Sequence, residues 1–195
     1  MSELKFRDLR ADEIDCRIAM VKQNGLSLLL YKDARCDMNI LDETVGAYNW
    51  QRSHSRDNAN CTVSIYDEKK GQWISKEDTG TESNTEKEKG LASDSFKRAC
   101  FNWGIGRELY TAPFIWVDAS LCSISGGKCY DKFEVTEIKI ENKKIIALTI
   151  VNAKTGNVVY QTGKKVAAAK TAQKPKQEIN STVADDLGDL PFDIR

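Results

Sequence analysis

The most regular pattern of apolar and polar residues lies between residues 86 and 103, and it predicts an amphipathic helix. Apolar side chains recur there at the three- and four-residue spacing of one helix face, at Ala92, Phe96, Ala99 and Trp103. Two capping-box patterns stand at its start, formed by Ser83 with Glu86 and by Thr85 with Glu88. Gly104 is a typical stop signal, because glycine readily adopts the left-handed backbone that follows a helix.

Three short segments of alternating polarity precede this helix and predict an antiparallel meander. They cover residues 50–56, 60–66 and 72–78. Turns of hairpin length separate them. In the middle segment Cys61, Val63 and Ile65 share one face, which we expect to be buried. The predicted order is three strands followed by one long helix that packs across their sheet.

The pattern before residue 50 predicts two helices and one strand. Apolar residues at roughly helical spacing predict a first helix over residues 7–23, with a stripe of Leu9, Ile14, Ile18 and Val21. Gly25 would end this helix, and residues 26–31 predict a strand. Residues 37–47 predict a short helix that closes near Gly46.

After Pro113 the chain predicts further strands and then a flexible end. Alternation over residues 133–140, 144–152 and 157–161 predicts either a second small antiparallel sheet or an extension of the first. The predicted fold class is α+β, an antiparallel meander packed by one long helix. The predicted division is a core in residues 1–112, a β-rich extension in 113–162, a flexible basic linker in 163–182 and a disordered acidic tail in 183–195.

Composition and charge fit one domain with extensions. The chain has 195 residues, of which 41% are hydrophobic, enough to form a core. Its formal net charge is zero, but residues 161–182 carry +4 and residues 183–195 carry −3, which leaves the body near −1. If the body binds nucleic acid, its positive charge must be focused in a groove.

Targeting signals and metal-binding patterns are both missing from the sequence. No apolar run approaches the length of a membrane span, and the N-terminal Met-Ser-Glu-Leu-Lys-Phe lacks the regions of a signal peptide. We therefore expect a cytoplasmic protein without a membrane partner, whose six cysteines are reduced thiols, with Cys61 and Cys100 in the core. Because there is no C-x-x-C pair and His54 is the only histidine, we expect no metal site.

The long helix carries a consecutive basic pair, Lys97 and Arg98. Because the two residues are consecutive, they cannot both lie at the centre of the buried face. At about 100° per residue, Arg98 lies about 200° from Phe96, near the opposite side of the helix. We therefore expect the pair at the margin of the buried stripe, where a polyanion could reach it. The alternative is a solvated helix face, on which Asp94 and Arg98 form a weakly stabilising pair one turn apart.

A second basic pattern lies on the first meander strand, where one face carries Trp50, Arg52, His54 and Arg56. Basic residues interleaved with an aromatic suit single-stranded nucleic acid. The alternative is a solvent-facing strand anchored by one buried Trp. We favour the alternative, because Asp33 and Asp57 are close in sequence and would dilute the positive field.

Several motifs, taken in order, resemble those of a known family. They are Ile14-Asp-Cys-Arg17, the segment that ends in Gly46-Ala-Tyr48-Asn-Trp50, the run Lys97-Arg98-Ala99, and the pair Trp103-Gly104. Together they resemble the Rad-fifty-two superfamily of single-strand annealing proteins, in the style of its phage-encoded members. The resemblance covers about residues 5 to 110.

This resemblance implies an ATP-independent, non-enzymatic protein that binds single-stranded DNA and anneals complementary strands, in homologous recombination or phage DNA repair. It implies a β-β-β-α annealing core, a homo-oligomeric ring and, for a phage-encoded member, the bacterial host cytoplasm. By resemblance, Arg17, Lys97 and Arg98 line the inner phosphate groove and Lys69 makes an outer contact. The family commonly has a further Arg where this chain has Phe101.

The C-terminal end, Asp185-Asp-Leu-Gly-Asp-Leu-Pro-Phe192-Asp-Ile-Arg195, resembles the acidic tip of bacterial single-stranded DNA-binding proteins. Such tips imply docking to a host replication or repair protein. They stop at the Phe, however, whereas here three residues follow it. The alternative is an acidic tail that only keeps the protein in solution.

Catalytic patterns are few. Gly126-Gly-Lys-Cys lacks the spacing and the hydroxyl of a phosphate-binding loop, which argues against an ATP-driven recombinase, and there is no Gly-x-Ser-x-Gly. We therefore expect no catalytic residue and no cofactor.

Two rival functions stay open. One is a protective single-stranded DNA-binding protein without annealing activity. The other is a Mg²⁺-dependent nuclease built on Asp131, Glu137 and Lys139.

Overall fold

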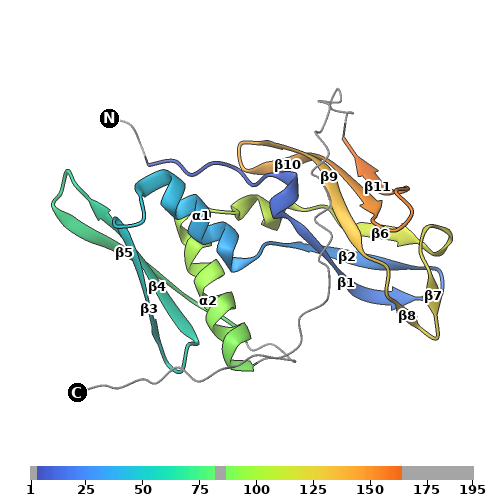
Figure 1. The fold of residues 1–195 in the computed structure, drawn as a ribbon, viewed down its shortest axis with the longest axis horizontal. Coiled ribbons are helices and arrows are strands. Elements are labelled where there is room, and N and C mark those ends of the chain that lie inside the picture. The colour runs from blue at the N-terminus through green and yellow to red at the C-terminus, as the bar shows by residue number, and fades with distance from the viewer. Residues whose placement is uncertain (1–3, 82–86, 164–195) are drawn as a thin grey trace, which may run out of the picture.

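A computed structural model of the chain describes residues 4–81 and 87–163, with side chains from residue 90 in the second range. In these ranges antiparallel sheets combine with two α-helices (Figure 1). The expected α+β fold class is thereby confirmed. The predicted capping boxes, the acidic tail and all of the linker except Gly163 lie outside the described residues.

The larger sheet has six strands in the order β11-β10-β9-β1-β2-β6, with antiparallel neighbours. Its strands are β1 Asp15–Lys22, β2 Gly25–Tyr31, β6 Ile115–Asp118, β9 Phe133–Glu141, β10 Lys144–Asn152 and β11 Val158–Thr162. The strands predicted after Pro113 thus form a second sheet, separate from the meander. They join the N-terminal hairpin where Glu134 of β9 pairs with Asp15 of β1.

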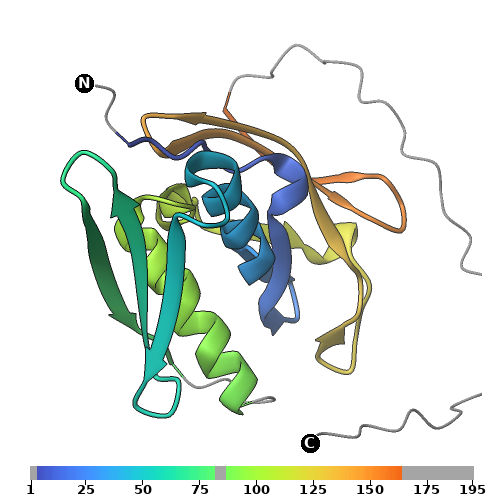
Figure 2. The same cartoon turned by 60° about the vertical axis from the view of Figure 1, so that its left-hand side comes forward.

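The smaller sheet is the predicted meander, in the order β3-β4-β5. Its strands are β3 Trp50–Ser55, β4 Asn60–Asp67 and β5 Gln72–Thr79. α2 (Lys87–Trp103) packs against β4 and β5, and α1 (Ala34–Val45) contacts α2 and β3. Figure 2 shows both helices between the meander and the larger sheet. The predicted buried stripe of α2 is centred on Phe96 and Ala99, which are both fully buried.

The predicted helix over residues 7–23 is wrong. The structure has a short 3-10 turn, η1 (Ala11–Glu13), followed by strand β1. Ile14, Cys16 and Ile18 alternate with the exposed Asp15 and Arg17, which is the period-two pattern of a strand. The same residues also fit a helical stripe, but pairing with β2, which has an irregularity between Ile18 and Met20, satisfies the backbone groups on the facing edges of both strands.

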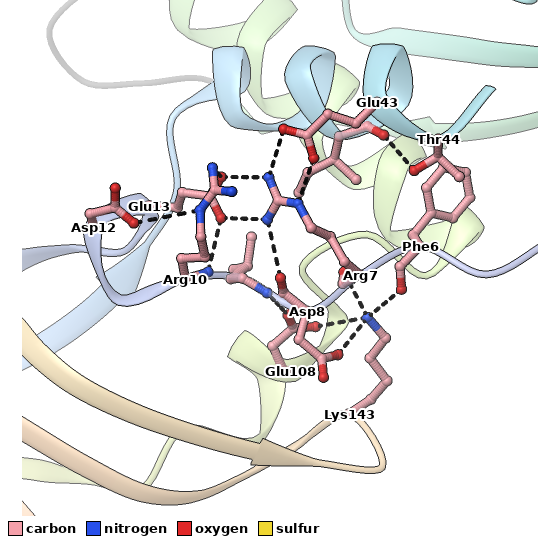
Figure 3. Close-up of polar contacts among 12 residues, drawn as sticks. Phe6, Arg7, Asp8, Arg10, Asp12, Glu13, Glu43, Thr44, Glu108 and Lys143 are labelled. Atoms are coloured by element: carbon pink, nitrogen blue, oxygen red, sulfur yellow. Dashed lines mark hydrogen bonds and ion pairs between the residues drawn. The ribbon is translucent and has the colours of Figure 1, made fainter. Parts of the chain in front are cut away.

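A network of ion pairs ties the segment before β1 to the rest of the fold (Figure 3). The Arg7 guanidinium donates to Glu13 at 2.7 Å and to Glu43 of α1 at 2.6 Å. These two carboxylates raise the pKa of Arg7 above its ordinary value. Lys143, in the β9–β10 turn, lies 2.8 Å from an Asp8 carboxylate oxygen. The segment is therefore held between α1 and the larger sheet, and this fixes the entry into β1.

The remaining described elements are short. They are η2 Arg107–Thr111, η3 Ala119–Leu121, β7 Ile124–Ser125 and β8 Lys128–Cys129. Within residues 4–81 and 87–163, no helix combines the length and apolar character needed to cross a membrane. All six cysteines are free thiols, and Cys61 and Cys100 are buried as expected.

Candidate nucleic-acid interface

A groove of about 570 Å³ lies between α2 and the β1–β2 hairpin, and we call it the α2–β2 groove. The hairpin contributes Arg17, Leu29 and Tyr31 to its lining. α2 contributes Asp94, Lys97 and Phe101. The lining is completed by Leu30, Lys32, Leu109 and Tyr110.

The strand alternation of the hairpin turns Arg17 toward this groove. Arg17 pairs across the ladder with Leu29, and the two side chains therefore share one face of the sheet. Leu29 is 45% exposed, whereas its neighbours Leu28 and Leu30 are buried, and Leu30 also borders the groove. Arg17 is exposed, on the same face of the sheet as Leu29.

The helical period places Lys97 on the opposite wall. Asp94, Lys97 and Phe101 are three and four residues apart, so they share the face of α2 that borders the groove. Arg98 points elsewhere, because its Nε lies 3.3 Å from an Asp78 carboxylate oxygen on β5. The structure thus brings Lys97 together with Arg17 and places Arg98 against the meander.

The floor of the groove contains a buried ion pair between Lys32 and Asp37, which are 1% and 0% exposed. The Lys32 ammonium also lies 4.5 Å from the centre of the Phe101 ring. Burial raises the pKa of Asp37 to about 6, although the ion pair with Lys32 opposes the rise. At neutral pH Asp37 is therefore a carboxylate that fixes the position of Lys32.

Apart from Lys32, whose charge is neutralised by the buried Asp37, the groove is lined by two cations, Arg17 and Lys97, and by one carboxylate, Asp94. That carboxylate also accepts a hydrogen bond from the Thr81 amide at 2.9 Å, so it is committed to the loop that leads toward α2. The groove is therefore locally positive, although the body of the chain is not. Such focusing is the condition for polyanion binding by a chain without a global basic charge.

Lys69 lies in a different place, on the β4–β5 turn. It borders a separate hollow of about 840 Å³ whose lining includes Ile65, Ile74 and Trp103. Lys76 closes this hollow toward α2, with its ammonium 4.5 Å from the centre of the Trp103 ring. Of the four predicted contact residues, two line the α2–β2 groove, and Lys69 and Arg98 do not.

The face of β3 that carries Trp50, Arg52 and His54 lies beside α2, but Arg52 is exposed and Trp50 is half-buried, so the favoured interpretation of a solvent-facing strand is confirmed only in part. The Trp50 ring stacks on Phe96 with centroids 6.1 Å apart, and the Arg52 guanidinium lies 4.6 Å from the centre of the same ring. His54 Nδ1 is 3.5 Å from the Ser95 hydroxyl. Burial, followed by the charge of Arg52, lowers the pKa of His54. Contacts with Phe96 and Ser95 of α2 therefore cover part of this face.

The three residues considered for a nuclease have separate partners. Asp131 accepts hydrogen bonds from the Ser123 amide at 2.7 Å and from the Asn152 side chain at 3.0 Å. Glu137 accepts one from the Thr149 hydroxyl at 3.2 Å, and Lys139 pairs with Glu141 at 2.8 Å. In the part of the chain that the structure describes, no group of three or more His, Cys, Asp or Glu residues is arranged to hold a metal ion.

Sequence reasoning missed three groove residues, Tyr31, Lys32 and Tyr110. Tyr31 could have been found, because it follows Leu29 by two residues on the outer face of β2. Lys32 and Tyr110 carried no local signal, since their places depend on contacts with Phe101 from another element.

Comparisons of the chain with protein-family models, with curated proteins and with solved structures give no match.

Proposed function

We propose that this protein binds single-stranded DNA in the α2–β2 groove and anneals complementary strands without ATP, as a phage-type member of the Rad-fifty-two superfamily acting in recombination or DNA repair. The observation that carries the proposal is the convergence of Arg17 and Lys97, from distant parts of the sequence, on one groove with exposed aromatic rings. Proteins that bind single strands without sequence preference combine a positive groove with aromatic faces.

Annealing requires a strand whose phosphates are neutralised while its base edges stay free to pair. Contacts from Arg17 and Lys97 to phosphates would meet the first requirement, because phosphate contacts position a strand without reading its bases. The charge of a single groove is small. Repetition of the groove around a homo-oligomeric ring would supply a continuous track, and this part of the proposal rests on the resemblance.

The proposal assigns different roles to the two members of the basic pair. Lys97 would contact phosphate in the groove. Arg98 would hold α2 against β5 through Asp78 and reach DNA only if that ion pair opens. Lys69, on the exposed β4–β5 turn, remains the proposed outer contact, outside the α2–β2 groove.

An annealing assay tests the function directly. Complementary oligonucleotides, one of them labelled, are mixed with the full-length protein without nucleotide, and duplex formation is followed over time with and without Mg²⁺. We expect accelerated pairing in both conditions. Tight binding without acceleration would favour a protective protein, and loss of the labelled strand only with Mg²⁺ would favour a nuclease. A strict requirement for ATP would contradict the proposal.

A further inference from the structure

We propose that Tyr110 is a stacking platform for one nucleobase of the strand bound in the α2–β2 groove. The inference rests on the proposed function and adds a specific contact to it. Tyr110 lines the groove and yet is 66% exposed, so its ring is open to solvent beside the cationic wall. A ring in this position can take a base while Arg17 and Lys97 hold the flanking phosphates.

The ring of Tyr110 is fixed from behind without being covered. It meets the Phe101 ring edge-on, with centroids 4.8 Å apart and an interplanar angle of 64°. Phe101 is held in turn by the Lys32 ammonium, 4.5 Å from its centroid, and Lys32 is fixed by the buried carboxylate of Asp37. This chain of contacts orients Tyr110 from the floor of the groove.

The backbone that carries Tyr110 is anchored on three sides. The fully buried Glu108 accepts a hydrogen bond from the Leu9 amide at 2.7 Å. The Arg107 guanidinium donates to the Phe101 carbonyl at 2.8 Å, and the Thr111 hydroxyl accepts one from the Ile145 amide at 2.9 Å. η2 is thus fastened to the N-terminal segment, to α2 and to β10. A platform held in this way loses little conformational entropy when a ligand stacks on it.

The other strongly exposed aromatics of the described chain lie in different surroundings. Tyr48, at 98% exposure, follows the end of α1, and Phe114, at 73%, stacks on Trp116 of the edge strand β6. Tyr130, at 84% exposure, borders a separate hollow that also contains Asp131. Among the described aromatics that are more than half exposed, Tyr110 is the one that lines the groove with Arg17 and Lys97.

The test compares DNA with bases to DNA without them. Full-length wild type, Tyr110→Ala and Tyr110→Phe are titrated with oligothymidylate and with an abasic oligonucleotide of equal length. Tyr48→Ala is the matched control, since it removes an exposed Tyr from outside the groove. Stacking on one aromatic predicts that Tyr110→Ala weakens binding of oligothymidylate by about 5- to 150-fold. It should leave the binding of the abasic strand unchanged. It should also leave unchanged the salt slope, which is the slope of the logarithm of the binding constant against the logarithm of the salt concentration.

Tyr110→Phe and Tyr48→Ala should retain both affinities. A 2-aminopurine base in the oligonucleotide gives a direct readout, because its fluorescence should be quenched by wild type and less by Tyr110→Ala. An equal loss of affinity for both strands would overturn the inference, since Tyr110 would then act through the shape of the groove. Unchanged binding by Tyr110→Ala would overturn it as well. If wild type binds neither strand, the proposed function itself fails.

Discussion

Lys97 and Arg98 are consecutive in α2, about 100° apart around the helix, and they have different surroundings. Lys97 lines the α2–β2 groove with Arg17, and Arg98 lies 3.3 Å from Asp78 of the meander. The family resemblance implies that both residues contact phosphate. In the structure, however, Lys97 lines the groove and Arg98 forms an ion pair with Asp78. Single substitutions can therefore distinguish the two roles.

Lys97→Ala should weaken single-stranded DNA binding and lower the salt slope by about 0.7, the value for one lost phosphate contact on a single strand. Adding Arg17→Ala should lower it by about 0.7 again. Salt-dependent titrations of the folded variants measure both effects. Arg98→Ala should change the slope less than Lys97→Ala, and Lys139→Ala, an exposed cation outside the groove, should not change it. Equal slopes for Lys97→Ala and Arg98→Ala would show that both residues contact phosphate.

Trp103→Ala should destabilise the protein rather than selectively impair DNA binding. The Trp103 indole donates to the Val63 carbonyl at 3.0 Å and packs under Lys76. Removing a large aromatic side chain from this junction should lower the free energy of unfolding by about 3 kcal/mol. Trp103→Phe, which removes mainly the hydrogen bond, should cost about 1 kcal/mol. Urea unfolding measures both, and an equally stable Trp103→Ala variant with a binding defect would make Trp103 a DNA contact.

Gly106→Ala should be more damaging than Gly126→Ala, although both glycines have positive φ, at 68° and 58°. The backbone penalty of about 1–2 kcal/mol is common to both. A methyl group at residue 106 would in addition collide with the Lys32 side chain. At residue 126 a methyl group would meet no neighbouring atom of the described chain. We expect only Gly106→Ala to disturb the floor of the groove, measured as an extra loss of stability and of DNA affinity. Equal effects would mean that Lys32 can move freely.

Glu13 makes folding sensitive to acid. Burial alone would raise its pKa, but hydrogen bonds from the Arg7 side chain and the Arg10 amide hold it below its ordinary value. Because the pKa of Glu13 is lower in the folded state than in the unfolded state, the ionised carboxylate stabilises the fold. This stabilisation is fully present at a pH above the pKa of the unfolded state, about 4.3, and is lost as the pH falls through the pKa of the folded state.

Glu13→Gln should therefore lower the free energy of unfolding at pH 7 by about 1–3 kcal/mol, and the difference from wild type should shrink below about pH 4. Urea unfolding across this pH range measures it. Glu141→Gln, on an exposed surface pair, is the control and should change little. A difference from wild type that stays constant with pH would contradict the role of the Glu13 charge.

Deletion of residues 183–195 should leave the described fold intact and tighten single-stranded DNA binding at low salt. The removed segment carries four Asp, and a linker of about 20 residues spans roughly 25 Å on average, so the acidic tail could compete with DNA for the groove cations. The gain should fade at high salt, where charges are screened. Unchanged DNA affinity together with loss of a host replication or repair protein in a pull-down would instead identify the tail as a docking peptide.

The sequence by itself determined the elements whose own periodicity or turn residues specify them. Helix α2 ends at Trp103 before Gly104, and the inward-facing Cys61, Val63 and Ile65 of β4 are all at most 4% exposed, as their alternation predicted. The chemistry of Lys97 could likewise be proposed from its place beside the apolar stripe. In each case the information lies within one helix or one hairpin, where local geometry sets which face a residue occupies.

The tertiary structure alone decided the rest. The stripe of residues 7–23 fits a helix and a strand, and β1 is a strand because β2 pairs along it and β9 pairs with its first residue, Asp15. The meeting of Arg17 with Lys97, the separation of Arg98, and the support of Tyr110 by Phe101 and Lys32 all join side chains from different elements. Such contacts depend on how the sheets and helices pack, and packing arises from burial and pairing between distant segments, which no local pattern records.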